Sequence, residues 1–213
     1  MKKIVQAFST AFFLFIILGV LFGSIYPLIS FGIAKIITPE KAQGSLIYQG
    51  DQVIGSRLIA QNFQSEGYFH SRPSACDYNG AKSAGSNLGP TSKKLYENLE
   101  KNAKAYRKVN GLDRYTPIPA DAVTFSGSGL DPHISTKNAK LQAPRVATAQ
   151  NLSLQVILDL IEQSTEKKTF GIFGRERVNV LILNLAIQQT SKASSNKKTS
   201  YGTVKTTRQK LSL

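Results

Sequence analysis

The amino-terminal segment between Lys3 and Lys35 contains no charged side chain and consists mostly of Phe, Ile, Leu and other apolar residues. An α-helix rises about 1.5 Å per residue, so ~20 apolar residues already cross the ~30 Å hydrocarbon layer of a bilayer. This segment is long enough to cross that layer with residues to spare. The sequence therefore predicts a transmembrane anchor over residues 1–37, followed by a water-soluble domain.

A cleaved secretory signal is the alternative interpretation of the same segment, with Lys2 and Lys3 as its basic region. No A-x-A cleavage triplet follows the apolar core, and the hydrophobicity continues beyond Gly23 as far as Ile37. We therefore favour a retained anchor. Pro27 lacks a backbone N–H donor, and we expect it to kink the helix or to end its membrane portion.

Charge counting hardly decides the orientation of this anchor. Lys2 and Lys3 precede the apolar segment, and Lys35 and Lys41 follow it. Long domains translocate largely regardless of their charge. We expect a single-pass arrangement in which the amino terminus stays inside and the main domain lies outside the cytoplasm.

The rest of the chain suffices for one compact domain, which we place at residues 38–188 and assign to the α+β class. The single cysteine, Cys76, excludes an internal disulfide. Residues 189–213 form a basic tail that contains no acidic residue, although the whole chain carries a formal charge of +14. We expect this tail to be disordered and solvated; binding of nucleic acid or anionic lipid is the alternative.

Periodicity and turn residues predict five elements in this domain. We expect a β-hairpin at 45–58, a helix at 91–110 that ends at Gly111, and a helix from Ser135 or Thr136 to Ala149 that Pro144 interrupts. A helix at 154–164 and a buried strand at 177–187 complete the set. Two Gly/Ser/Pro-rich segments, 67–90 and 117–135, lie between these elements and are candidates for a binding surface.

Several motifs of ion pumps and channels are missing from the sequence. It contains no G-x-x-x-x-G-K-[ST] phosphate loop, no D-K-T-G-T phosphorylation segment and no T-V-G-Y-G potassium filter. If this chain serves a pump or a channel, it therefore does so as a non-catalytic accessory subunit.

The loop SGSGLDPHIS offers the only constellation with catalytic residue types. Ser126 or Ser128 as nucleophile, His133 as base and Asp131 as orienting group would make a membrane-anchored extracytoplasmic hydrolase. The nucleophile-elbow pattern G-x-S-x-G is not matched, and we favour a structural loop over this alternative. A metal site built from His70, Asp77, Asp131 and His133 matches no ligand spacing, so we identify no metal ligand and no catalytic residue.

The same loop has a simpler physical interpretation. Gly127 and Gly129 permit positive φ angles, and Ser135 begins a helix whose free N–H groups attract anions. A structural role and a ligand-binding role are compatible here.

Five long segments, in the same order, resemble the C subunit of the bacterial Kdp potassium-transporting ATPase. They are YFHSRPSA (68–75), YNGAKSAGSNLGP (78–90), PADAVTFSGSGLDPHIS (119–135), QAPRVATAQNLS (142–153) and RVNVLILNLAI (177–187). The chain differs from the family pattern at Ala60 and Ala84, where the family usually has Gly, and at Arg175 and Glu176, where it usually has Glu-Pro.

This resemblance implies a single-span subunit of the bacterial cytoplasmic (inner) membrane. Its expected partners are a potassium-channel-like A subunit, a P-type ATPase B subunit and a small F subunit. Potassium is transported by the whole complex, and no site for it is identified in this chain.

The resemblance also implies a catalytic chaperone that raises the affinity of the hydrolysing subunit for ATP, with ATP as the cofactor. For a bound nucleotide we single out hydroxyls, a helix start and a fixed cation: Ser126, Ser128, His133, Ser135, Gln142 and Arg145. The alternative is that these residues form a face that docks on the channel-like subunit, which a domain outside the cytoplasm favours.

Overall fold

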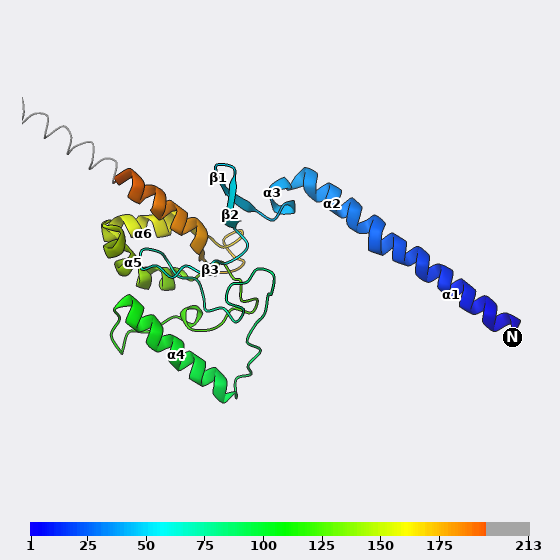
Figure 1. Cartoon of the computed structure of the whole chain (residues 1–213), viewed down its shortest axis with the longest axis horizontal. Coiled ribbons are helices and arrows are strands. Elements are labelled where there is room, and N and C mark those ends of the chain that lie inside the picture. Colours follow the sequence, from blue (N-terminus) through cyan, green and yellow to red (C-terminus); the bar gives the residue numbers. More distant parts are fainter. Residues whose placement is uncertain (195–213) are drawn as a thin grey trace, which may run out of the picture. The chain divides into compact units, whose positions relative to one another are not determined.

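The computed structural model describes residues 1–194 of the chain (Figure 1). The chain divides into two compact units, one comprising Met1–Ser56 and one beginning at Arg57. Helices and small antiparallel sheets occur together, so the fold is of the predicted α+β class.

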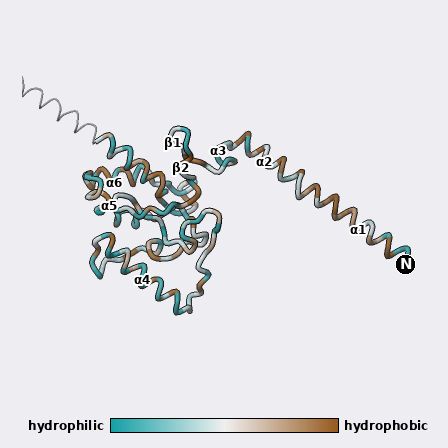
Figure 2. Tube along the Cα trace, in the orientation of Figure 1, coloured by the Kyte–Doolittle hydropathy of each residue, from teal (hydrophilic) through white to brown (hydrophobic). Residues whose placement is uncertain are grey.

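The first unit begins with one long apolar helix. It consists of α1 (Lys2–Val20), the π-helical turn η1 (Leu21–Ile25) and α2 (Tyr26–Ile37). Most of its residues are hydrophobic, which Figure 2 shows by their brown colour, and none of its residues is buried. By length and composition it is suited to cross a membrane, and it is consistent with a single-pass anchor.

Pro27 lies within this long helix and does not end it. That the membrane portion ends near Pro27 stays a prediction. The π-helical turn lies directly before Pro27, which falls in the first turn of α2. A π-turn shifts the hydrogen-bond pattern, and a proline at the start of a helical segment loses a donor that would have had no partner. The apolar helix therefore continues to Ile37.

A short helix α3 (Pro39–Ala42) and a β-hairpin complete the first unit. The hairpin pairs β1 (Leu46–Gln49) with β2 (Gln52–Ser56) in antiparallel register. Gly50 lies in its turn with a φ angle of +61°, a conformation that glycine adopts without steric cost. The predicted hairpin is confirmed.

The second unit packs helices against a small sheet. Helix α5 (Thr136–Gln150) contacts α6 (Leu154–Gln163), and the three-stranded antiparallel sheet has the order β3 (His133–Ile134), β5 (Arg177–Asn179) and β4 (Thr165–Glu166). The largest fully buried apolar side chains include Phe69, Ile134, Ile157, Ile161, Leu183 and Ile187. This core fixes the sheet edge that carries the site described below.

The three predicted helices of this unit are present. Helix α4 (Lys93–Asn110) ends at Gly111, which has a left-handed conformation. In α5 and α6 the hydroxyls of Ser135 and Ser153 accept hydrogen bonds from backbone N–H groups in the first turn, as capping residues do.

Pro144 does not interrupt α5, so that part of the prediction is wrong. The helix runs continuously from Thr136 to Gln150. Pro144 removes the hydrogen bond to the carbonyl group of Lys140, and Lys140 is exposed to water. Water can hydrate the carbonyl that the proline leaves without a partner.

The predicted strand at 177–187 is also wrong beyond its first three residues. Strand β5 ends at Asn179, and a helix runs from Val180 to residue 194, the last residue described. The Asn179 Oδ1 atom accepts a hydrogen bond from the Ile182 N–H at 3.2 Å and so caps this helix. Val180, Leu183 and Ile187 are buried at helical spacing.

The predicted basic tail at 189–213 starts inside this helix. Residues 189–194 are helical, and the remainder lies outside the described residues.

Two Gly/Ser-rich loops, residues 73–85 and 126–130, lie against each other through backbone contacts. The Ser128 carbonyl accepts hydrogen bonds from the Ala84 N–H at 3.0 Å and from the Ser83 hydroxyl at 2.9 Å. The Ser74 hydroxyl donates to the Gly129 carbonyl at 2.7 Å. Small residues permit this approach, because no large side chain separates the two backbones.

Replacing Gly129 by alanine is expected to destabilise this pair of loops. Gly129 has a φ angle of +70°, and a Cβ atom there would lie 2.7 Å from the Ala84 carbonyl oxygen. Backbone strain and the clash together should lower the free energy of unfolding by about 2–4 kcal/mol, measured by urea denaturation in detergent. Gly127→Ala is the matched control, since a Cβ atom on Gly127 would meet nothing within 4 Å. Equal stability of the two variants would contradict the prediction.

Candidate functional site

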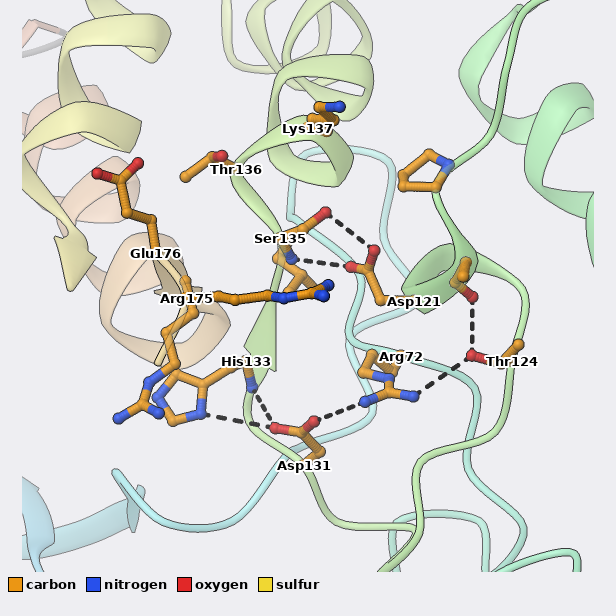
Figure 3. A pocket seen from close by; sticks show the side chains of 14 residues that line it. Arg72, Asp121, Thr124, Asp131, His133, Ser135, Thr136, Lys137, Arg175 and Glu176 are labelled. Atoms are coloured by element: carbon orange, nitrogen blue, oxygen red, sulfur yellow. Dashed lines mark hydrogen bonds and ion pairs between the residues drawn. The ribbon is translucent and has the colours of Figure 1, made fainter. Parts of the chain in front are cut away.

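A charged cavity of about 650 Å³ opens beside strand β3 and the start of α5 (Figure 3). Its lining comes from segments far apart in the sequence: Arg72, the 3₁₀ turn η2 (Ala120–Ala122), β3, the first turn of α5, and the segment that enters β5. Its ionisable lining residues are Arg72, Asp121, Asp131, His133, Lys137, Arg175, Glu176 and Arg177. In the view of Figure 3 the Arg175 side chain extends across the cavity.

A row of ionisable side chains from Arg72 to Arg177, which we name the charge chain, runs beside this cavity. The Arg72 Nη1 atom lies 2.9 Å from Asp131 Oδ2, and Asp131 Oδ1 lies 3.5 Å from His133 Nδ1. On the other side of the imidazole, Nε2 lies 3.5 Å from Glu166 Oε1, while Glu166 Oε2 lies 2.9 Å from Arg177 Nε. His133 thus sits between two carboxylates, each of which also contacts an arginine.

These contacts shift the pKa values of both carboxyl groups. Burial alone would raise the pKa of Asp131, but the hydrogen bonds from His133 and the Arg72 guanidinium outweigh it and lower the pKa to about 2. Burial likewise opposes ionisation of Glu166, and Arg177 and His133 overcome it and lower its pKa. Both carboxylates are therefore held in their charged form at neutral pH.

The start of α5 already holds an anion, the carboxylate of Asp121. This carboxylate accepts hydrogen bonds from the Ser135 N–H at 2.8 Å, the Ser135 hydroxyl at 2.9 Å and the Asn138 amide at 3.0 Å. A carboxylate at a helix N-terminus is electrostatically favourable. The Ser135 N–H, the Ser135 hydroxyl and the Asn138 side-chain amide are thus bound to a group of the protein itself.

Gln142 and Arg145 lie further along α5 in a polar network. The Gln142 side chain, 1% exposed, exchanges hydrogen bonds with the His70 backbone at 2.8 and 3.1 Å. The Arg145 guanidinium donates to Gln142 Oε1 at 3.0 Å, Asn110 Oδ1 at 2.9 Å and the Tyr68 carbonyl at 3.0 Å. These two residues tie α5 to the end of α4 and to the segment around Tyr68.

The six residues predicted to contact a nucleotide therefore fall into three places. His133 and Ser135 line the cavity, and Gln142 and Arg145 belong to the polar network. Ser126, 3% exposed, and Ser128 belong to the loop that packs on residues 73–85. Ser135 donates to Asp121, while Gln142 and Arg145 donate within the polar network. Binding of a nucleotide by these six residues stays a prediction.

The sequence analysis missed Arg72, Glu166 and Arg177 as site residues, and it did not foresee the role of Asp121. No short-range pattern links them, since they come from separate segments of the chain. Arg72, Asp121 and Arg177 do lie within three of the segments on which the family resemblance rests, and that resemblance is the signal that points to them.

The geometry of the hydrolase alternative is not formed. The Ser128 Oγ atom accepts a hydrogen bond from the Leu130 N–H at 3.1 Å, and Ser128 does not line the cavity that contains His133. The imidazole nitrogens of His133 face carboxylates. Over residues 1–194, no three His, Cys, Asp or Glu side chains are grouped as a metal site would require.

These features define a class of protein: a small α+β domain joined to a helix suited to membrane anchoring, with a polar cavity beside which Asp131 and Glu166 are each paired with an arginine.

Comparison with known proteins gives the family within this class. The family model described as K+-transporting ATPase, c chain, matches residues 8–189. A potassium-transporting ATPase KdpC subunit of Cereibacter sphaeroides is 49% identical over 170 residues, which are 80% of this chain and 90% of that protein. The KdpC subunit of Myxococcus xanthus is 46% identical over 187 residues, 86% of this chain and 88% of that protein. The KdpC subunit of Mycobacterium tuberculosis strain H37Rv is 47% identical over 176 residues, which are 82% of this chain and 93% of that protein. The chain belongs to the KdpC family, the C subunits of the Kdp potassium-transporting ATPase.

The lowered pKa of Asp131 predicts a pH-dependent contribution to stability. The carboxylate stabilises the fold above the pKa it has in the unfolded chain, near 3.8, and this contribution is lost as the pH falls towards about 2. We expect Asp131→Asn to cost about 1–2 kcal/mol at pH 6 and progressively less between about pH 4 and pH 2. Thermal melts followed by circular dichroism across this range measure the difference. A difference that stays constant with pH would show that the charge of Asp131 does not contribute.

Proposed function

We propose that this chain is a non-catalytic docking and assembly subunit of the potassium pump, and that the face around the charged cavity meets the channel-like A subunit. The observation that carries this proposal is the charge chain from Arg72 to Arg177. It brings residues of three family segments together on one face and pairs both of its carboxylates with arginines.

Charge and rigidity both suit this face to protein recognition. Its inner charges are paired across β3, β4 and β5, which holds the cavity wall in one arrangement. Lys137 and Glu176 lie exposed at its lining and present charges of both signs. Complementary charge across an interface fixes register and suppresses wrong partners.

The proposed role in ATP use is indirect. The residues expected to hold nucleotide are divided among three places, and Asp121 takes the anion position at the start of α5. We propose that any gain in the ATP affinity of the hydrolysing subunit follows from docking and stabilisation of the complex. Direct binding of ATP by this chain stays a prediction that the family resemblance implies.

Charge reversal at the cavity tests the docking surface. We expect the double variant Lys137→Glu and Glu176→Lys to lower co-purification of the full chain with the A and B subunits several-fold, because both substitutions replace attraction by repulsion. Lys93→Glu and Glu97→Lys on the exposed surface of α4 are the matched control, since this pair has the same charges and spans one helical turn. Equal loss in both variants, or none in either, would contradict a docking role for the cavity face.

Protease accessibility in intact spheroplasts tests the orientation, which we propose to be amino terminus inside and main domain outside. An antibody to the region of Tyr96, which is 63% exposed, detects the fragments. We expect cleavage of the domain before lysis, because long domains translocate largely regardless of charge. Protection until lysis would place the domain in the cytoplasm and make direct contact with ATP the better explanation of the chaperone role.

A further inference from the structure

The turn between β4 and β5 carries an exposed apolar tip, which we define as residues 169–174. Phe170, Ile172 and Phe173 are 89%, 76% and 66% exposed. They contribute no buried surface to the core of the domain, which the helices and the sheet fill. A cluster of large apolar side chains in water marks a contact surface on a soluble domain.

The backbone holds this tip in a defined shape. Thr169 and Phe173 form an isolated antiparallel bridge, with the Thr169 N–H donating to the Phe173 carbonyl at 2.9 Å and the Phe173 N–H donating back at 3.0 Å. Between them, the Gly171 N–H donates to the Lys168 carbonyl at 3.0 Å. The apolar side chains are therefore displayed by a hydrogen-bonded turn.

Phe170 occupies a backbone conformation that bulky residues avoid. Its φ angle is +54°, next to Gly171 at +74°. An aromatic residue in the left-handed region is unfavourable, and here its ring gains no burial in return. A strained backbone that holds the Phe170 ring exposed to water points to a role of this ring in binding.

Basic residues flank the tip. Lys167 and Lys168 precede it and Arg175 follows it, while Glu166, which is paired with Arg177, and Glu176 lie just outside these residues. Lys167 and Lys168 are exposed. Phenylalanine and isoleucine beside lysine form the combination by which proteins bind the headgroup region of anionic bilayers, since the rings enter the acyl boundary while the ammonium groups contact phosphates.

We propose that residues 167–175 are a second membrane contact, which inserts Phe170, Ile172 and Phe173 into the interface of an anionic phospholipid bilayer. The bilayer is the one that holds the amino-terminal helix. Residues 38–56 tether the domain to that helix, so the tip meets lipid at a high effective concentration and needs little intrinsic affinity. This inference goes beyond docking on other subunits, and it concerns the chain by itself.

A fluorescent probe at the tip tests this proposal in the full chain. In a Cys76→Ser background, Ile172→Cys is labelled with an environment-sensitive dye, and the chain is reconstituted alone into vesicles. One set contains phosphatidylcholine, and the other contains equal parts of phosphatidylcholine and phosphatidylglycerol. Tyr115→Cys, at a site 87% exposed and outside the tip, is the matched control.

We expect a blue-shifted emission and several-fold stronger quenching by brominated lipid at position 172 than at position 115 in the phosphatidylglycerol vesicles. Adding Phe170→Ser and Phe173→Ser should abolish both signals, and Lys167→Gln with Lys168→Gln should reduce them to the level seen in pure phosphatidylcholine. Circular dichroism of each variant checks that the domain remains folded.

Three results would overturn the proposal. One is equal, water-like emission at positions 172 and 115 in both kinds of vesicle. Another is a shift at position 172 that does not depend on phosphatidylglycerol. The third is shielding that arises only when the A and B subunits are reconstituted together with the chain, since that would identify the tip as a protein contact. Loss of co-purification at the cavity face is measured separately, so the two proposals fail independently.

Discussion

Helix α5 is held in place by a ladder of polar side chains, which joins it to α4, to the 3₁₀ turn η2 and to the backbone of His70. Asp121 binds the first turn through Ser135 and Asn138. Asn138 Oδ1 then accepts from the Gln142 amide at 2.9 Å and from the Tyr106 hydroxyl at 2.8 Å. Buried polar groups are costly unless each finds its partner, so a satisfied ladder of this kind specifies one arrangement.

The ladder also explains why the cavity lies where it does. By binding Ser135, Asp121 fixes the beginning of α5 directly after β3, and β3 pairs with β5. His133 on β3 is thereby set between Asp131 and Glu166, the latter on β4. Burial and the nearby charge of Asp121 raise the pKa of Tyr106, which keeps its hydroxyl protonated as a donor to Asn138. Asp121 and Ser135, which position α5, thus also line the cavity that we propose as the docking face.

Local sequence patterns predicted the elements whose boundaries are chemically marked. The apolar segment, the Gly50 turn, the Ser135 and Ser153 caps and the Gly111 end were all found by such marks. The helix after β5 was missed, because β-branched and apolar residues at 178–187 satisfy a strand pattern as well as a helical one. The decisive mark was Asn179, whose side chain caps the helix while its backbone belongs to β5.

Residue order along the chain is enough to establish the apolar amino-terminal segment, the α+β class and the family. What the polar residues do depends on which groups the fold brings together. Gln142 and Arg145 were singled out for a nucleotide, and the fold places them against residues 66–70, where both donate hydrogen bonds to backbone carbonyls. Asp121 and Ser135 are distant in sequence and adjacent in space. The physical reason is that a donor binds the nearest acceptor in three dimensions, and sequence patterns do not encode that distance.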